Sequence, residues 1–250
     1  PDHLQMVKGS SALRRDAVDG LAVQLSKTYG AIKADYSAAL RQRNLLIKSE
    51  VHAGPLFESW DESAAVNGAR LTVNRMRLFS RLAEHLGAIY AQLADGERLE
   101  CAYVPSWMRF DGAGRQRPDA QSLEQLASCA DAEGLAVEEV QAKLEEASRR
   151  LAAQELSRKT SLVGPHKDEI AFFVNGRNAR LFASQGQQRT IVLAEKLAEV
   201  ELVREFTGNA PVLLLDDVMS ELDARRRDAL TAFIDRSTQT FITTTNLGYF

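Results

Sequence analysis

The sequence predicts an α/β fold in which a parallel sheet flanked by helices is joined to a long helical, coiled-coil-like arm. The sheet is indicated by residues 212–215, an unbroken apolar run of the kind that is covered on both faces. A helical run at residues 187–206 comes just before it. The arm is indicated by three stretches between residues 13 and 158 in which apolar residues recur every three or four positions.

Composition and charge fit a globular protein and exclude several classes. Of the 250 residues, 45% are hydrophobic and 26% are charged, which is ordinary for a soluble domain. No apolar run approaches the roughly 20 residues of a membrane span and no signal peptide opens the chain, so we expect a cytoplasmic protein without a membrane partner. Cys101 and Cys129 are too few for a disulfide framework or a zinc site. With a net charge of −3, any DNA binding must come from local patches.

The first two helices of the arm follow each other directly. Residues 13–48 predict a long helix, with a break near residues 28–30 as the alternative to one continuous helix. Gly54 and Pro55 then make a turn, and residues 56–92 predict a second helix. Two helices joined by such a turn would pack antiparallel.

The chain then returns toward the sheet through a strand and a third helix. Alternation of apolar and polar residues at positions 99–103 predicts the strand. Residues 137–151 predict the helix, which is expected to end near Arg158.

A hairpin is expected just before the helix at residues 187–206. Asn175-Gly176 between the runs 170–174 and 177–182 is the strongest short hairpin signal. His166 precedes it and has no zinc or serine partner nearby in the sequence, so a structural role is favoured over a catalytic one.

Ser184 marks the start of the helix that follows. With Gln187 three residues later it forms a capping box, in which each residue satisfies the amide of the other. A well-capped helix is one interpretation. Gly186 favours another, because a residue without a side chain lets a phosphate approach the positive end of a helix. On these residues alone both interpretations stay open.

The apolar strand ends in two carboxylates, Asp216 and Asp217. In open α/β sheets ligands bind beyond the carboxyl ends of strands, where hydrated magnesium is commonly held. The alternative, an aspartate that caps a turn, is less favoured because two acids directly follow four aliphatic residues.

A further helix at residues 224–234 is expected to be capped by Asp223, with a strand at residues 241–245 after it. Three arginines in the first turn of this helix oppose its dipole and therefore suggest a partner for them. That partner is either a set of nearby acids, or DNA or another subunit. The arginines are Arg225, Arg226 and Arg227.

Basic residues that would contact a DNA backbone fall in two places. Lys8, Arg14 and Arg15 surround the expected start of the first helix, and Arg41 and Arg43 lie on its charged face. Contact with phosphates is one interpretation, and a solvated helix surface is the other.

Three motifs together resemble one family. Ala183-Ser-Gln-Gly-Gln-Gln-Arg189, Leu213-Leu-Leu-Asp-Asp217 and Ser220-Glu-Leu-Asp223 are similar to the signature motif, the Walker B motif and the D-loop of ATP-binding-cassette (ABC) ATPases of the chromosome-maintenance (SMC) class. The resemblance implies a partial P-loop NTPase head that carries the helical arm. Residues 1–15, 41–44 and 164–168 agree with it, so the resemblance runs from end to end.

The sequence has no G-x-x-x-x-G-K-[ST] loop, the Walker A motif that cradles phosphates. By the family pattern this loop belongs to a lobe preceding residue 1, so we expect a fragment that binds ATP poorly by itself. The expected division is residues 1–16 as the exit from that lobe, residues 17–160 as the arm (lobe II), and residues 161–250 as the signature, Walker B and D-loop part of the head.

The resemblance also implies a role for each motif residue. Asp216 would hold Mg²⁺ through water. Asp217 would be catalytic, at the position where relatives place a glutamate that orients the attacking water, and its shorter side chain implies slow turnover. The other residues would contact ATP bound by a second copy, in trans, or line the same interface: Ser184, Gln185, Gly186 and Gln187 at the signature, and Ser220, Glu221, Leu222 and Asp223 in the D-loop.

For the intact protein the resemblance implies an ATP-dependent homodimer of DNA replication, recombinational repair and the SOS response. It would bind single-stranded or gapped and double-stranded DNA, act as a weak DNA-dependent ATPase, and help to load recombinase with mediator proteins. The alternative is a structural DNA-organising arm protein without ATP turnover, since the chain keeps the arm and lacks the phosphate loop. A response-regulator receiver is a weaker rival, because it has no place for three long helices.

Overall fold

The computed structural model of the chain describes residues 4–111, 114, 135–234, 238–246 and 248. The chain divides into two compact units that interleave in sequence. The first unit holds residues 1–8, 81–100 and 172–250, and the second holds residues 9–80 and 101–171. These units are defined by packing, so the functional division at residues 16 and 160 stays a prediction.

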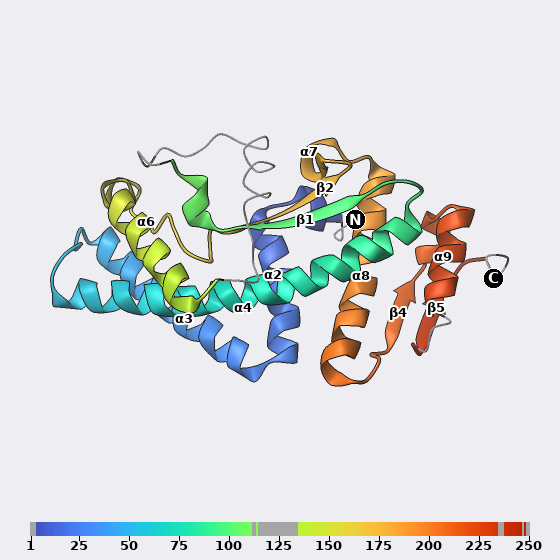
Figure 1. Cartoon of the computed structure of the whole chain (residues 1–250), viewed down its shortest axis with the longest axis horizontal. Helices are drawn as coiled ribbons and strands as arrows, with labels where there is room; N and C mark the ends of the chain where they lie inside the picture. The colour runs from blue at the N-terminus through green and yellow to red at the C-terminus, as the bar shows by residue number, and fades with distance from the viewer. Residues whose placement is uncertain (1–3, 112–113, 115–134, 235–237, 247, 249–250) are drawn as a thin grey trace. The chain divides into compact units, whose positions relative to one another are not determined.

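The second unit is mainly helical (Figure 1). Helices α2 (Ser11–Leu25) and α3 (Lys27–Lys48) pack against each other across a break at Ser26. The Ser26 hydroxyl accepts a hydrogen bond from the Tyr29 amide (3.3 Å) and so caps α3. The alternative with a break is therefore confirmed, and the break lies just before the expected place.

Two further helices complete this unit. Helix α4 (Pro55–Leu93) begins in it, and α6 (Val137–Arg158) ends where the sequence predicts. The two helices share a buried apolar cluster, to which the 3₁₀ helix η2 (Ser106–Arg109) adds Trp107. The cluster consists of Ala69, Val73, Val140 and Leu144.

A three-stranded sheet has the order β1-β2-β3, with β1 at Leu99–Val104, β2 at Glu169–Val174 and β3 at Arg177–Asn178. Strands β2 and β3 are antiparallel. Asn175 (φ 50°) and Gly176 (φ 75°) make the turn, with the two positive φ angles that a type I′ turn requires. The predicted hairpin is confirmed.

The prediction of a second hairpin strand over residues 177–182 is wrong in its length. The Asn178 side chain accepts a hydrogen bond from the Arg180 amide (3.0 Å) and starts helix α7 (Ala179–Phe182). An asparagine that caps a helix therefore ends the strand after two residues.

The first unit contains α1 (Gln5–Lys8), which packs against α7 and α8. Helix α8 (Gln185–Thr207) is buried around most of its circumference between Gln188 and Leu202. It ends at Gly208, whose φ of 71° makes a left-handed cap. Strands β4 (Leu213–Asp216) and β5 (Thr240–Thr243) pair in parallel. The 3₁₀ helix η3 (Val218–Glu221) and α9 (Ala224–Ile234) lie between them in the chain.

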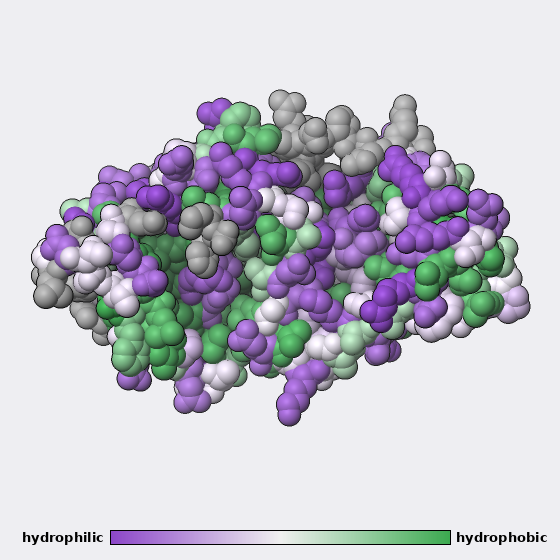
Figure 2. Space-filling model, turned by 180° about the vertical axis from the view of Figure 1, so that it is seen from behind, coloured by the Kyte–Doolittle hydropathy of each residue, from purple (hydrophilic) through white to green (hydrophobic). Residues whose placement is uncertain are grey.

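The prediction that the strand at residues 212–215 is covered on both faces is wrong for the described residues. Leu213 and Leu215 are buried, but Leu214 is 72% exposed. Its register partner on β5, Phe241, is 56% exposed. Apolar side chains reach the surface over β4 and β5 in Figure 2. In the described part of the chain this two-stranded sheet is covered on one face only.

Among the described residues, no helix is both long and apolar enough to cross a membrane.

Candidate functional site

A capping box holds the start of α8. The Ser184 hydroxyl accepts a hydrogen bond from the Gln187 amide (3.2 Å), and the Gln187 side-chain oxygen accepts one from the Ser184 amide (2.8 Å). The predicted cap is confirmed. Ser184 and Gln185 are exposed, and Gly186 is half-buried. The first turn of a helix leaves amides without intrahelical partners, so an anion is favoured at this end.

Two residues that sequence reasoning missed hold the cap from the side. The Gln187 Nε2 donates to Glu97 Oε1 (2.7 Å), and the Tyr90 hydroxyl donates to Glu97 Oε2 (2.7 Å). Burial and the hydrogen bond to Glu97 raise the pKa of Tyr90, so the phenol remains a neutral donor. Tyr90 and Glu97 are far from α8 in the sequence, and no local pattern pairs them with it.

The carboxyl end of β4 places the two aspartates differently. Asp216 is exposed and accepts a hydrogen bond from the hydroxyl of Thr243 on β5. Asp217 turns out of the strand with a left-handed φ of 48°. Its amide donates to the Thr243 carbonyl (3.1 Å) and hydroxyl (3.1 Å). A non-glycine residue in this conformation is strained, and such strain clusters at functional sites.

One oxygen of the Asp217 carboxylate lacks a donor. Oδ2 accepts a hydrogen bond from the Ser220 hydroxyl (2.9 Å), whereas Oδ1 is buried and has no partner in the described part of the chain. A buried acceptor without a donor costs roughly 1–3 kcal/mol. We therefore expect a water molecule or a bound group at Oδ1.

The segment after β4 leads into α9. Ser220 is exposed, Leu222 is buried, and the side chain of Glu221 lies outside the described residues. Asp223 caps α9 as predicted, because its Oδ1 accepts a hydrogen bond from the Arg226 amide (2.9 Å). Its Oδ2 also lies 3.0 Å from Arg226 Nη1.

The signature and D-loop segments meet within the first unit. A Cβ atom placed on Gly186 would lie 3.8 Å from Arg226 Nη1 and 3.9 Å from Ser184 Oγ. The Arg226 guanidinium thus lies beside the positive end of α8. Asp223 Oδ2 already pairs with Arg226 Nη1 (3.0 Å), and the free amides at the start of α8 favour a further anion beside them.

The arginines at the start of α9 find acids as partners. Arg225 forms an ion pair with Asp95, and Arg226 forms one with Asp223. For these two arginines the interpretation with nearby acids is confirmed.

The oxygens at the end of β4 fit a hydrated Mg²⁺. Asp216 offers an exposed carboxylate next to the Thr243 hydroxyl. Within the described ranges, no group of three or more His, Cys, Asp or Glu residues is placed to enclose a metal. Mg²⁺ usually takes one or two carboxylates and completes its shell with waters and phosphate oxygens. The donors present therefore suit a metal that arrives with a nucleotide.

Two predicted DNA contacts are wrong. Arg14 and Arg43 are buried, with 3% and 5% exposure. Arg14 Nη2 lies 2.8 Å from Glu169 Oε1, and Arg43 Nη2 lies 2.8 Å from Glu155 Oε2. A guanidinium paired inside the fold cannot reach a DNA phosphate.

The other three predicted DNA contacts differ in exposure. Arg15 is half-buried and donates to the Asp168 carbonyl (2.6 Å), so part of its guanidinium is already occupied. Lys8 and Arg41 are exposed, and DNA contact there stays a prediction.

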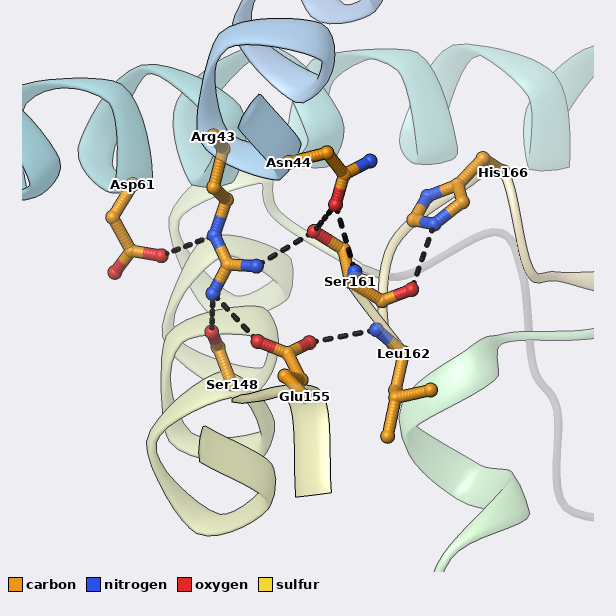
Figure 3. A network of polar contacts seen from close by, with 8 residues as sticks. All are labelled: Arg43, Asn44, Asp61, Ser148, Glu155, Ser161, Leu162 and His166. Atoms are coloured by element: carbon orange, nitrogen blue, oxygen red, sulfur yellow. Dashed lines mark hydrogen bonds and ion pairs between the residues drawn. The ribbon is translucent and has the colours of Figure 1, made fainter. Parts of the chain in front are cut away.

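Arg43 is the centre of a polar network in the second unit (Figure 3). Its Nε donates to Asp61 (2.7 Å), and its Nη1 donates to the Ser161 hydroxyl (2.6 Å). His166 continues the network, with Nε2 3.3 Å from the Ser161 carbonyl and Nδ1 2.6 Å from the Tyr36 hydroxyl. Burial lowers the pKa of His166 to about 3, so the imidazole is neutral. This is the structural role that the sequence favours.

Comparison with known proteins relates the whole chain to one family. No family model matches it. The DNA replication and repair protein RecF of Symbiobacterium thermophilum is 41% identical over 248 residues, which cover 99% of this chain and 60% of that protein. RecF of Thermosynechococcus vestitus is 38% identical over 252 residues, with the same coverage.

Solved structures agree. The recombination mediator protein RecF-ATPrS of the RecFOR pathway matches with a TM-score of 0.78 and 28% identity, over 99% of this chain and 61% of that one. RecF-ATP of the same pathway matches with a TM-score of 0.76. The predicted α/β fold with long helices is therefore confirmed as that of RecF. The chain is similar to part of RecF and spans about 60% of the length of the curated relatives it matches.

Proposed function

We propose that this chain, as part of a RecF-type protein of DNA replication and repair, supplies the signature helix, the Walker B strand and the D-loop of ATP sites shared between two copies. The observation that carries the proposal is the meeting of two motifs in one compact unit. The capped start of α8 lies beside Arg226, which Asp223 of the D-loop holds in place.

ATP bound by one copy would be contacted by the signature of the other. Ser184, Gln185, Gly186 and Gln187 stand at the start of α8, where free amides and the helix dipole favour the γ-phosphate. The D-loop residues would line the same interface. RecF structures with ATP and ATPrS support a nucleotide in the family.

The strand end would serve hydrolysis in the copy that binds ATP. Asp216 and the neighbouring Thr243 hydroxyl would hold the water shell of Mg²⁺, which when bound neutralises phosphate charge. Asp217 would orient the attacking water. This role is supported by its Oδ1, which has no donor in the described part of the chain, and by Ser220, whose hydroxyl fixes Oδ2. An aspartate reaches less far than a glutamate, so slow turnover is expected.

The nucleotide would control DNA binding and cooperation with recombination mediators in the cytoplasm. In this scheme residues 17–160 act as the arm and residues 161–250 as the ATPase part, with residues 1–16 leading in from a Walker A lobe. The alternative is a structural DNA-organising protein whose nucleotide motifs do not turn over ATP.

Substitution of Ser184 by arginine tests the shared site in the full-length protein. The bulk of the arginine side chain would block the approach of a phosphate to the start of α8. We therefore expect ATP binding to remain and ATP-dependent dimerisation to be lost in sedimentation velocity. Ser49→Arg, at the exposed end of α3, is the matched control and should dimerise like the wild type. Persistence of the ATP-dependent dimer in Ser184→Arg would contradict the proposal.

Substitution of Asp217 by alanine separates the two candidate functions. For an ATPase, turnover should vanish while the ATP-bound dimer persists. A structural protein would show no nucleotide dependence in either assay.

A further inference from the structure

A long acid-free segment of the first unit lies just before and within the start of α8. Residues 175–194 contain no aspartate or glutamate, although the chain has 34 of them. The same segment holds Arg177, Arg180 and Arg189. A chain with a net charge of −3 thus carries a local excess of three positive charges here.

All three arginines are exposed, and Arg177 and Arg180 stand on the same short elements as two exposed apolar side chains. Arg177 on β3 and Arg180 on α7 are exposed, and within the described residues neither forms an ion pair. Leu181 and Phe182 are 56% and 57% exposed. The Arg177 guanidinium carbon lies 4.6 Å from the centroid of the Phe182 ring, which holds the two side chains together.

Neighbouring elements keep this surface positive. Helix α1, which carries the exposed Lys8, packs against α7. The hairpin turn is hydrogen-bonded to Arg98, whose backbone amide donates to Asn175 Oδ1 (2.8 Å). Two acids nearby already have partners: Glu100 is paired with that same Arg98 (3.2 Å), and Glu97 accepts hydrogen bonds from Gln187 and Tyr90.

We propose that β3 and α7 form a binding surface for single-stranded nucleic acid, with Arg177 and Arg180 on the phosphates and Phe182 under a base. Guanidinium groups release counterions from a phosphate backbone and supply affinity. An exposed aromatic ring offers a stacking platform that an unpaired base can use and a duplex cannot. The proposal deepens the DNA-binding part of the proposed function and rests on it, but it requires no nucleotide.

The test uses fluorescence anisotropy of a labelled oligo-dT with the 250-residue chain, without ATP. We expect Arg177→Glu with Arg180→Glu to weaken binding at least tenfold. The slope of log K against log salt should fall by about 1.4, because each phosphate contact on a single strand contributes about 0.7. The matched control is Arg149→Glu with Arg150→Glu, an exposed pair on α6 with the same charge change, which should keep near wild-type affinity.

Phe182→Ala tests the stacking component. We expect it to weaken oligo-dT binding about tenfold and to leave binding of a duplex of the same length unchanged. Circular dichroism of each variant verifies that the fold is intact.

Three results would overturn the proposal. If both double variants lose the same affinity for oligo-dT, the net charge of the chain and not this surface determines binding. If Phe182→Ala binds oligo-dT as tightly as the wild type, Phe182 does not stack on a base. If Phe182→Ala instead abolishes self-association and leaves DNA binding intact, the surface is an interface between copies. Since ATP is absent from the assay, failure here is distinct from failure of the Ser184→Arg experiment.

Discussion

Burial separates the charged side chains that hold the fold from those that can bind a partner. Arg75 is only 3% exposed, and its Nε lies 2.7 Å from Asp19 Oδ1. Its Nη1 also donates to the Pro165 carbonyl (2.7 Å). Breaking such a buried pair would leave an uncompensated charge, so Arg75 has a structural role. Arg177 and Arg180 are exposed, which leaves their guanidinium groups accessible to an anionic ligand.

Glu195 is a buried acid whose protonation should set part of the pH dependence of stability. Burial, followed by the charge of Glu199, raises its pKa to about 8, and Lys196 offsets this only in part. An acid with a raised pKa in the fold is protonated there while the unfolded chain ionises. The free energy of unfolding should therefore fall between about pH 4.5 and 8 by on the order of a few kcal/mol.

Glu195→Gln should remove this fall, since the amide imitates the protonated acid. In urea unfolding we expect the variant to match the wild type near pH 5 and to be more stable near pH 8.5. Glu84→Gln, an exposed residue of α4, should keep the wild-type pH dependence. A parallel pH dependence of Glu195→Gln and wild type would contradict the raised pKa.

At the scale of elements, both ends of α8 are set by local chemistry. The capping box starts it, and Gly208 ends it with a φ of 71°. A Cβ on Gly208 would meet nothing within 4 Å, so only the backbone conformation opposes a larger residue. An L-residue pays roughly 1–2 kcal/mol in the left-handed region.

Gly208→Ala should therefore lower the free energy of unfolding by about 1 kcal/mol in urea titrations. Gly20→Ala is the matched control, because Gly20 lies inside α2 with open space around it and an ordinary helical φ. The control should stabilise by roughly 0.5–1 kcal/mol. Stabilisation by both substitutions would show that the left-handed cap has no cost for alanine.

Local sequence motifs predict the ends of these elements well. They do not predict contacts between segments that are far apart in the sequence. The hairpin turn and the cap at Ser184 are predicted from residues within four positions of where they act. The ion pairs of Arg14 and Arg43 join residues more than 100 positions apart. The same holds for the contact of Glu97 with Gln187, 90 positions away. The periodicity of a sequence contains no information about such distant pairs. For this reason the prediction that Arg14 and Arg43 contact DNA is wrong.

At the scale of the whole molecule, the β4–β5 sheet is the feature that is incomplete by physical criteria. Parallel sheets are normally covered on both faces. Here Leu214 and Phe241 stand side by side on an exposed face, and Val212 next to the strand is 54% exposed. Contiguous apolar surface of this kind marks a binding site or a site of aggregation. The curated relatives are longer than this chain, so their additional residues are available to cover it.

Leu214→Lys with Phe241→Lys should therefore reduce self-association of the 250-residue chain in sedimentation velocity, with little change in its unfolding. The exposed pair Leu45→Lys with Val51→Lys is the control for charge and should associate like the wild type. In a protein of the relatives' full length we expect the opposite effect of the sheet variant, a loss of stability, because lysines would then be buried against the covering segment. If the full-length protein tolerates both lysines, the face is open there too, and the additional residues do not complete this sheet.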